Sequence, residues 1–399
     1  MVRELTILEY SNYIFHSKQV NFVSSEYMLD YFLKDGRKIH LLGLVIDDKI
    51  VGAGLFVTYK LKKVFKIAKC NQGPIIDFSN LEYLKLFISG IRDFFKQKGY
   101  LFVELVPSFE ISKRDIDGNL VQEINRDLIK NLEIAGGKHL GFNNGFINGV
   151  GRWFFVKELD DQDLLLKSFD NRHRRAINQA LSLGVKIVDN NHEYLADFIN
   201  MMNMTAQRHK FNNRGYNYFD SLLKSFKDNI IFSIAILDKE TYFQQLTNLK
   251  VELSNQIQKY LDNDKKAGVV QDLERRLLDV KNKLESVDQL FLDRKELVLS
   301  GAIFVYYNHE FVYLFGCSDD QYRHFKGSTL LQYHGMVKAL SLGIKKYNFY
   351  GTMGKYCGYD DEGVYLFKRS FGGRVVEQAG NFRIACNRFL TKIYSLFRK

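Results

Sequence analysis

A heptad pattern in residues 239–298 constrains the fold of this chain of 399 residues most strongly. Its apolar positions are separated by alternating steps of four and three residues: Leu273, Leu277, Val280, Leu284, Val287 and Phe291. Such spacing places one hydrophobic stripe along a helix and is typical of a coiled coil. A looser version of the stripe precedes it, at Leu246, Leu249, Leu253, Ile257 and Tyr260. A polar stretch ending in Gly, residues 262–268, separates the two and indicates a turn, so we predict an antiparallel helical hairpin rather than one long helix.

Strands and helices alternate outside this arm, and one unit occurs twice. A helix expected at 81–97 is followed by Gly99 and a strand, and a helix expected at 329–341 is followed by Gly343 and a strand. In both units the Gly stands where a helix commonly ends. The second unit begins with a short Gly-Ser loop at 325–328, and the loop, helix and strand resemble the core of the Gcn5-related acetyltransferase fold. The alternative is two ordinary units without common ancestry.

We therefore predict a mixed α/β protein with two acetyltransferase-like subdomains. The first is expected to span residues 1–150, and the second residues 151–238 and 299–399. The helical arm at 239–298 is inserted into the second, between two apolar strands.

Composition excludes several classes of protein. Hydrophobic residues make up 46% and charged residues 26% of the chain, as in soluble globular proteins. The four cysteines lie far apart without metal-ligand spacing, so neither a disulfide framework nor a metal site is expected: Cys70, Cys317, Cys357 and Cys386. The start does not resemble a signal peptide, and the longest apolar runs are strand-sized. We expect a reduced, cytoplasmic protein.

The net charge of +11 is unevenly placed. Residues 364–399 contain eight Lys or Arg and one acid, Glu377, and a second basic cluster occupies residues 171–175. Such patches suit tRNA phosphates, a pyrophosphate or an anionic membrane surface, whereas the alternative is a merely solvated face. The C-terminal patch also predicts peripheral attachment to the inner face of the membrane.

Several motifs appear in a fixed order along the chain. Residues 363–373 read GVYLFKRSFGG, resemble a G-x-x-x-F-K-x-x-F-G segment, and are followed by Glu377 and Gly380. Residues 205–214 fit T-x-x-R-x-x-F-x-x-R, and residues 169–177 fit F-x-x-x-x-R-x-x-I. A Phe-Tyr-Gly strand end at 349–351 and a Gly-Pro turn at 73–74 complete the set. Together these motifs resemble the FemABX family of peptidoglycan aminoacyl-tRNA transferases.

The resemblance implies amide formation between two large substrates. A side-chain amine on the stem peptide of a peptidoglycan precursor would attack the ester of an aminoacyl-tRNA, adding Gly, Ala or Ser to the interpeptide bridge. The acceptor would be lipid II or its soluble relative UDP-MurNAc-pentapeptide. Such a site orients the substrates and stabilises an oxyanion, without a metal or other cofactor.

The resemblance also implies roles for individual residues. Lys368, beside Phe367, is the candidate catalytic group, because an ammonium can stabilise a developing oxyanion. Arg214 and Lys34 are candidates for the phosphates of the precursor, since a guanidinium can grip phosphate oxygens bidentately. Further residues are expected to bind the precursor (Arg208, Tyr350) or the tRNA (Arg172, Arg174, Arg175). Tyr350 and Tyr313 could line the channel, with buried packing as the alternative. For each charged residue, the alternative is an ordinary surface charge.

One position departs from the family pattern. Many members carry an Asp before the Pro that follows the first repeat's strand, but this chain has Val106 before Pro107. Val106 cannot accept a proton, and Glu104 is a poor substitute because its direction depends on strand regularity. A carboxylate base at this place is therefore not expected.

Two other functions remain open from the sequence. One is an acetyl-CoA-dependent acyltransferase of the same fold, although residues 325–328 supply only part of a pyrophosphate loop. The other is a non-catalytic protein that binds RNA or protein partners through the arm and the basic patches. The sequence does not indicate the transferred amino acid, the bridge position, the form of the acceptor, the proton acceptor or the oligomeric state.

Overall fold

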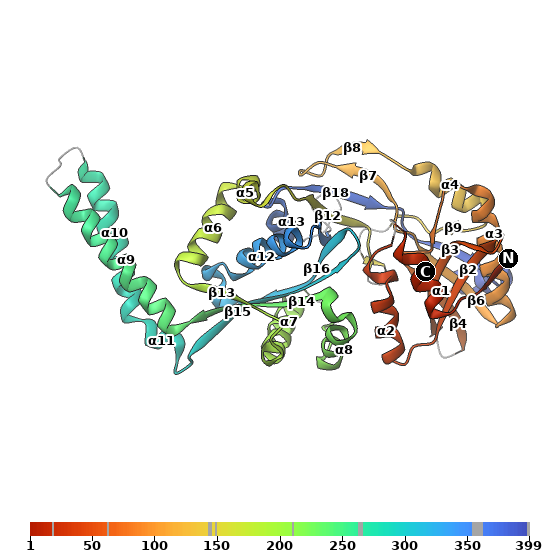
Figure 1. The fold of residues 1–399 in the computed structure, drawn as a ribbon, viewed down its shortest axis with the longest axis horizontal. Helices are drawn as coiled ribbons and strands as arrows, with labels where there is room; N and C mark the ends of the chain where they lie inside the picture. Colours follow the sequence, from red (N-terminus) through yellow and green to blue (C-terminus); the bar gives the residue numbers. More distant parts are fainter. Residues whose placement is uncertain are drawn as a thin grey trace.

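The computed structural model describes residues 1–17, 20–61, 64–142, 146–147, 150–209, 211–261, 266–352 and 362–396. Within these residues the chain forms two large β-sheets with helices on their faces and a helical arm that extends away from the second sheet (Figure 1). The predicted mixed α/β class is confirmed. No helix in the described part is long and apolar enough to cross a membrane.

The first sheet contains strands from the first third of the chain and one from its end. Its order is β1 (Val2–Glu4), β2 (Ile39–Ile46), β3 (Lys49–Leu61), β4 (Phe65–Asn71), β6 (Tyr100–Val106), β19 (Phe382–Ala385) and β9 (Lys138–His139), with β5 (Ile75–Ile76) paired to β3. Only β4 and β6 run parallel. Residues alternate between the faces, so Phe56 packs against α3 (Leu81–Gln97) and Leu55 against α1 (Ile7–Phe15). The helices α2 (Glu26–Lys34) and α4 (Arg126–Ile134) complete this first lobe.

The second sheet is longer. Its order is β13 (Val185–Asp189), β14 (Ile230–Asp238), β15 (Glu296–Tyr307), β16 (Glu310–Ser318), β17 (Lys346–Gly351), β12 (Trp153–Glu158), β18 (Arg374–Gln378), β7 (Glu110–Arg114) and β8 (Leu120–Glu123). One face is covered by α6 (Asn171–Ser182), α12 (Gly327–Ser341) and α13 (Glu362–Arg369). The other face is covered by α7 (Leu195–His209) and α8 (Tyr216–Phe226). These elements, with the short α5 (Gln162–Leu165), form the second lobe.

The two sheets exchange strands across the boundary predicted at residue 150. Strands β7 and β8 precede that boundary in the sequence but pair in the second sheet, because β7 lies antiparallel to β18. Strand β19 follows the boundary but lies between β6 and β9 of the first sheet. A short pair, β10 (Phe146–Ile147) and β11 (Val150–Gly151), lies at the crossing. Each sheet therefore contains strands from both sides of residue 150, whereas the predicted ranges assigned each side of that residue to one subdomain.

Both predicted helix–Gly–strand units are present. Helix α3 ends before Gly99, which has φ +76°, and α12 ends before Gly343, which has φ +73°. Each Gly takes the left-handed conformation that closes a helix C-terminus, and strand β6 or β17 follows. The helix and the following strand predicted in each unit are thus confirmed to within a few residues.

A buried ion pair joins β6 to β19 in the first lobe. Arg383 Nη2 donates to Glu104 Oε1 over 2.8 Å, and Lys69 Nζ lies 3.7 Å from Glu104 Oε2. Glu104 and Arg383 are both more than nine-tenths buried. Glu104 is therefore engaged inside the first sheet.

The arm consists of α9 (Lys239–Tyr260), α10 (Ala267–Glu285) and the short α11 (Val287–Phe291). Strands β14 and β15 are antiparallel neighbours, and the arm connects them. The seam buries heptad residues from both helices: Leu246, Leu253, Leu273, Val280 and Val287. Residues 262–265 of the predicted turn lie outside the described residues, and Gly268 lies inside α10 rather than at the end of the turn.

Candidate active site

Strands β16 and β17, in the middle of the second sheet, separate after a short parallel stretch. Only three residue pairs join them: Glu310 with Lys346, Phe311 with Tyr347, and Val312 with Asn348. Among the described residues, β16 bonds beyond these pairs only to β15, and β17 only to β12. On the α12 side, the Tyr347 hydroxyl donates to Gln332 Oε1 over 2.9 Å, and both side chains are fully buried. Within this described part, the sheet is therefore open between β16 and the Tyr350 end of β17.

Tyr350 lies at the open end of β17 with a backbone conformation rare for a residue with a side chain. Its φ is +63°, and its N–H donates to Asn348 Oδ1 over 2.7 Å. The ring stacks on Phe154, with centroids 5.2 Å apart, and lies 6.0 Å from Phe22 of the first lobe. Such strain persists only where surrounding contacts hold it, and it is frequent at functional sites. Burial raises the pKa of Tyr350, and the nearby Tyr218 and Glu310 raise it further.

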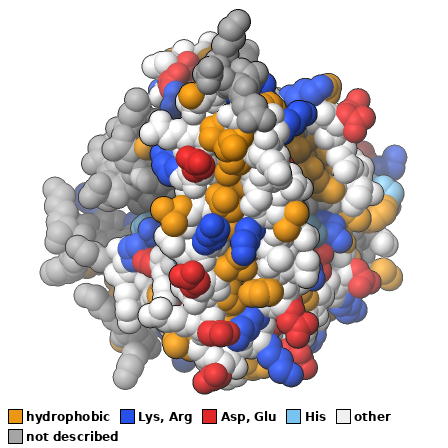
Figure 2. Space-filling model, turned by 90° about the vertical axis from the view of Figure 1, so that its left-hand side faces the viewer, with side chains coloured by type: hydrophobic (Ala, Val, Ile, Leu, Met, Phe, Trp, Pro, Cys, Tyr) orange, Lys and Arg blue, Asp and Glu red, His pale blue; other side chains and the backbone are white. Residues whose placement is uncertain are grey.

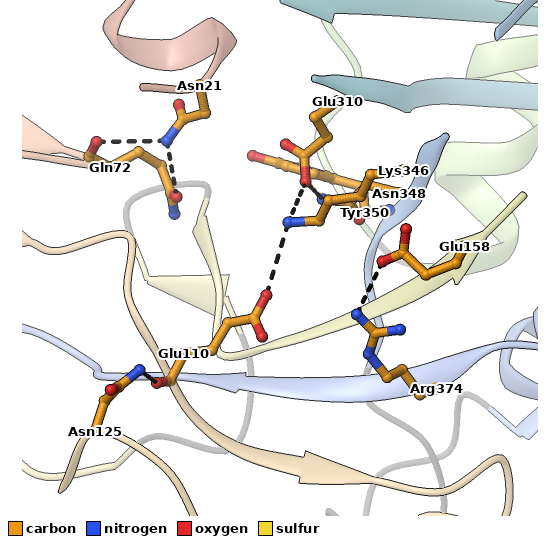
Figure 3. Close-up of polar contacts among 10 residues, drawn as sticks. All are labelled: Asn21, Gln72, Glu110, Asn125, Glu158, Glu310, Lys346, Asn348, Tyr350 and Arg374. Atoms are coloured by element: carbon orange, nitrogen blue, oxygen red, sulfur yellow. Dashed lines mark hydrogen bonds and ion pairs between the residues drawn. The ribbon is translucent and has the colours of Figure 1, made fainter. Parts of the chain in front are cut away.

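A cavity of about 360 Å³ lies between the two lobes, lined by Lys346 and Asn348 at the paired end of β17 and by Phe154, on which Tyr350 stacks. Three charged side chains meet in it: Lys346 Nζ lies 3.1 Å from Glu310 Oε1 and 3.7 Å from Glu110 Oε1 (Figure 3). Glu310 and, less strongly, Glu110 raise the pKa of Lys346 against the effect of its burial. Asn348 Nδ2 also donates to Glu310 Oε1, over 3.1 Å. The centre of the cavity is thus charged and hydrogen-bonded.

Amide and hydroxyl side chains line much of the remaining wall: Asn21, Gln72, Ser108, Asn125, Asn308 and Gln378. Asn21 donates to the backbone and side-chain oxygens of Gln72, over 3.4 and 3.3 Å, and Asn125 donates to the Glu110 carbonyl over 3.0 Å (Figure 3). Carboxamides offer both donors and acceptors, as peptide groups do. The wall is therefore suited to an extended peptide with a charged side chain.

Lys368 lies directly behind the open strand end. It belongs to α13, is only 5% exposed, and donates from Nζ to the Gly351 carbonyl over 2.5 Å. Gly351 follows Tyr350, so the predicted catalytic Lys is fixed next to the strained residue. Residues 353–361 of the adjoining segment, including Cys357, lie outside the described residues.

The basic cluster of α6 packs beside this helix. Asp170 caps α6 by accepting from the His173 N–H over 2.7 Å, and the buried His173 ring contacts Phe367 and Phe371. Arg172 and Arg175 are exposed, whereas Arg174 is half-buried and bonds to Asn171. The structure thus places the three arginines predicted to bind tRNA near the helix of Lys368.

Arg214 and Lys34 lie near a different pair of packed helices, Arg214 just before α8 and Lys34 at the end of α2. The Arg214 guanidinium lies 4.4 Å from the ring centroid of Tyr218 on α8, and this ring contacts Tyr31 on α2 at 5.6 Å. Lys34 is one helical turn beyond Tyr31 and is ion paired with Asp30 at 2.6 Å. Tyr218 also raises the pKa of Tyr350, so its hydroxyl lies within electrostatic reach of the open strand end.

Arg208 does not join this group. Its guanidinium is ion paired with Asp320, in the 3-10 helix Asp320–Phe325 that precedes α12. Its predicted role in substrate binding remains a prediction.

The position of the missing carboxylate is apolar. Val106 packs with Phe154, Val156 and Val376 beside the cavity. Glu104, the possible substitute, is held by Arg383 in the first sheet. The described residues contain no group of three or more His, Cys, Asp or Glu that could hold a metal.

A polar network elsewhere in the second lobe joins three elements. Asp189 accepts from His334 Nε2 at 3.0 Å, from the Ser233 hydroxyl at 2.6 Å and from Lys338 Nζ at 3.1 Å. Burial opposes ionisation, but these donors outweigh it and lower the pKa of Asp189 to about 2. This network ties β13 and β14 to α12.

Sequence reasoning missed the charged centre of the cavity. Glu110, Glu310 and Lys346 come from three strands, and no motif connects them. One signal was available: in β17 the residues Lys346, Asn348 and Tyr350 alternate with buried Tyr347 and Phe349. Period-two alternation places these polar residues on one face of a strand.

Comparison with known proteins gives one consistent result. Residues 5–399 match the model of the FemAB family. The aminoacyltransferase FemA of Staphylococcus epidermidis is 27% identical over 409 residues, covering 99% of this chain and 98% of that protein. The FemA of Staphylococcus aureus is 27% identical over 381 residues, covering 92% and 91%. The crystal structure of FemX superposes with a TM-score of 0.79 at 21% identity, covering 98% and 99% of the chains, and shows the same fold.

Proposed function

The chain belongs to the FemAB family and is an aminoacyltransferase, and we propose that it moves an amino acid from aminoacyl-tRNA onto a peptidoglycan precursor. The acceptor atom is a side-chain amine of the stem peptide, and the product extends the interpeptide bridge. Gly, Ala or Ser is transferred, and the acceptor is lipid II or UDP-MurNAc-pentapeptide.

One observation carries this proposal: three predicted groups of residues converge on the end of β17. Gly351 accepts from Lys368, Tyr350 packs against Phe154 at the cavity, and Tyr218 links Tyr350 to Arg214. A site for joining two large substrates needs such convergence, because orientation supplies much of the rate enhancement. The amide-lined wall supports a peptide acceptor there.

The transfer step requires no added oxidant or energy source. The acceptor amine attacks the ester carbonyl carbon, a C–N bond forms, and the carbonyl oxygen becomes negatively charged. The tetrahedral intermediate then expels the terminal ribose oxygen of the tRNA, which leaves as a hydroxyl with one proton, while the amine gives up its proton. The Lys368 ammonium stabilises the oxyanion, and the Gly351 carbonyl fixes its position.

The remaining basic residues position the two substrates. Arg214, held flat on Tyr218, and Lys34 bind the phosphates of the precursor. Arg172, Arg174 and Arg175 bind the tRNA backbone next to Lys368. No cofactor takes part, because the ester bond is already activated.

The test is a transfer assay with purified full-length chain. Lipid II and UDP-MurNAc-pentapeptide are each incubated with tRNA charged with Gly, Ala or Ser, and products are read by mass spectrometry. We expect a mass increase of one or more amino acids on one acceptor. Heat release with acetyl-CoA in calorimetry, without any product from charged tRNA, would instead support the acetyltransferase alternative.

The Lys368→Met variant tests the proposed oxyanion role. Methionine fills similar space without a charge, so kcat is expected to fall about 10²–10³-fold. Lys281→Met on the exposed surface of α10 is the matched control and should transfer at the normal rate. Undiminished transfer by Lys368→Met contradicts the assignment of Lys368. Tight tRNA binding without transfer by any variant or the parent chain favours the RNA-binding alternative.

We further propose that the enzyme works as a peripheral protein at the inner face of the membrane whenever its acceptor is lipid-linked. The basic C-terminal segment supports this location.

A further inference from the structure

Two segments far apart in sequence combine basic and exposed hydrophobic residues at the same end of the first lobe. The first is the end of the β3–β4 hairpin, with Lys60, Val64 and Lys66 exposed. The second is α14 (Arg388–Leu396). Neither residues 60–66 nor residues 387–396 contain an acidic residue.

These segments pack against one small core. Ile67, Leu101 and Phe102 form it, and both Phe65 of the hairpin and Tyr394 of α14 pack on it. The Tyr394 and Phe102 rings lie 5.4 Å apart, and the Thr391 hydroxyl donates to the Leu101 carbonyl over 3.0 Å. Figure 1 also places the C-terminal end in the lobe of β3 and β4. The two segments therefore form one surface.

We call this surface the hairpin–helix patch and define it by its described residues: Lys60, Leu61, Val64, Phe65, Lys66, Arg388, Phe389, Leu390, Lys392 and Ile393. Its hydrophobic members protrude: Val64 is 75% exposed, Phe389 73% and Leu390 38%. In α14 the buried Thr391 and the half-buried Tyr394 face the core, whereas Phe389 lies on the opposite side, and Arg388, Leu390 and Lys392 are also exposed. The patch is an amphipathic surface with positive charge only.

The arm has a different surface. On the face that carries it, basic and acidic side chains are interspersed around a narrow line of hydrophobic side chains (Figure 2). Three arm cations are ion paired with acidic side chains: Lys239 with Asp288 at 2.7 Å, Arg275 with Asp272 at 2.5 Å and Lys283 with Asp279 at 2.5 Å. A basic residue with an acidic neighbour adds little attraction for an anionic surface.

We propose that the hairpin–helix patch is a docking surface for an anionic lipid bilayer. Cations near such a bilayer are attracted to its headgroups, and exposed Phe, Leu and Val insert at the boundary between headgroups and acyl chains. A polynucleotide would use the cations but offers no apolar layer for Val64 and Phe389. The inference rests on the proposed function in one respect only, the purpose of docking: it holds the enzyme where a lipid-linked acceptor is found.

Vesicle co-sedimentation of the full chain tests the proposal. Vesicles of phosphatidylglycerol and phosphatidylcholine should bind the protein, and vesicles of phosphatidylcholine alone should bind much less. Lys60→Gln/Lys66→Gln is expected to lower the partition coefficient about 25-fold, or about fivefold per charge removed. Phe389→Ser is expected to lower it about tenfold, because a ring that enters the interface is lost.

Matched controls alter residues of the same type elsewhere. Lys281→Gln/Lys295→Gln and Val121→Ser, which are exposed residues outside the patch, should leave vesicle binding unchanged. The patch variants should unfold at the same urea concentration as the parent chain, which verifies folding, and vesicle binding is measured without either substrate, which separates this proposal from the proposed function. If the patch and control variants bind vesicles equally, or if the patch variants lose affinity for tRNA but not for vesicles, the proposal is overturned.

Discussion

The two helix–Gly–strand units of this chain have the same order of elements but end differently. In the first lobe, β4 and β6 stay paired over six residue pairs, from Lys66 with Tyr100 to Asn71 with Val106. In the second lobe, β16 and β17 pair over three and then separate. Every residue of β6 is buried, whereas Lys346, Tyr350 and Gly351 of β17 are partly accessible. The closed unit is buried throughout its strand, whereas the open unit leaves part of its strand accessible.

The ion pairs of the two units show the same contrast. Glu104 and Arg383 are buried between strands of the closed sheet, where they form an ion pair at 2.8 Å. Glu110, Glu310 and Lys346 face the cavity, with the Lys346 side chain 35% exposed. The ion pair of the first lobe therefore stabilises the fold, whereas the ion pairs of the second lobe are accessible to a ligand.

The largest expected effect concerns the closed unit. Arg383→Met removes the nearer of the two cations that contact the buried Glu104, so the free energy of unfolding should fall by about 3 kcal/mol or more. Urea denaturation measures it. The double variant Glu104→Leu/Arg383→Met removes both charges and should recover most of the loss. A single variant as stable as the parent would show that the closed unit does not depend on this pair.

The next effect is a loss of stability at acidic pH that originates in the second lobe. The pKa of Asp189 is lowered to about 2 in the folded chain, so its ionised form contributes stability above about pH 4. This contribution, about 1 to 2 kcal/mol, should be lost as the pH falls from about 4 to about 2. Asp189→Asn should flatten that part of the stability profile, as followed by thermal unfolding at each pH. An unchanged slope would contradict the assignment.

A variant in the cavity sharpens the contrast between stability and function. Lys346→Met should change the free energy of unfolding by less than about 1 kcal/mol, because the side chain is partly exposed. Transfer should nevertheless fall about tenfold, because Glu310 and Glu110 are left without their cation at the substrate site. Lys346→Arg, which keeps the charge, should restore part of the rate. A large loss of stability with normal transfer would show that Lys346 supports the fold and not the reaction.

The smallest effect should be equal in the two units. An added Cβ at Gly99 or Gly343 meets no atom within 4 Å, so Gly99→Ala and Gly343→Ala suffer only from the left-handed backbone. Each should lower the free energy of unfolding by about 1 kcal/mol, and the losses should add in the double variant. Unequal losses in urea denaturation would show that the two helix ends are not equivalent.

Local sequence signals predicted the arm helices, the two helix–Gly–strand units and the strands on either side of the arm. The 3.6-residue periodicity, the Gly residues after α3 and α12 and the heptad seam of the arm each act over a few residues. The family motifs likewise placed Lys368 and Arg214, whose surroundings the structure now provides. Because these signals are local, the element bounds agree closely with prediction.

The relations between distant strands could not be predicted in this way. Pairing of β7 with β18 and of β19 with β6 joins residues more than 250 positions apart, and nothing in a short segment specifies its partner. The charged centre of the cavity has the same origin. Glu110 meets Lys346 and Glu310 only because β7 crosses into the second sheet.

The crossing of β19 has a consequence for the order in which the chain matures. A ribosome delivers β1 to β9 early, yet β9 has no pairing partner other than β19 among the described strands. The N-terminal sheet must therefore wait, with the edge of β6 open, until Phe382–Ala385 of β19 have been translated. Completion of the first half of the molecule is in this way a late event, and a growing chain that stalls before residue 382 leaves an unfinished sheet exposed to chaperones and proteases.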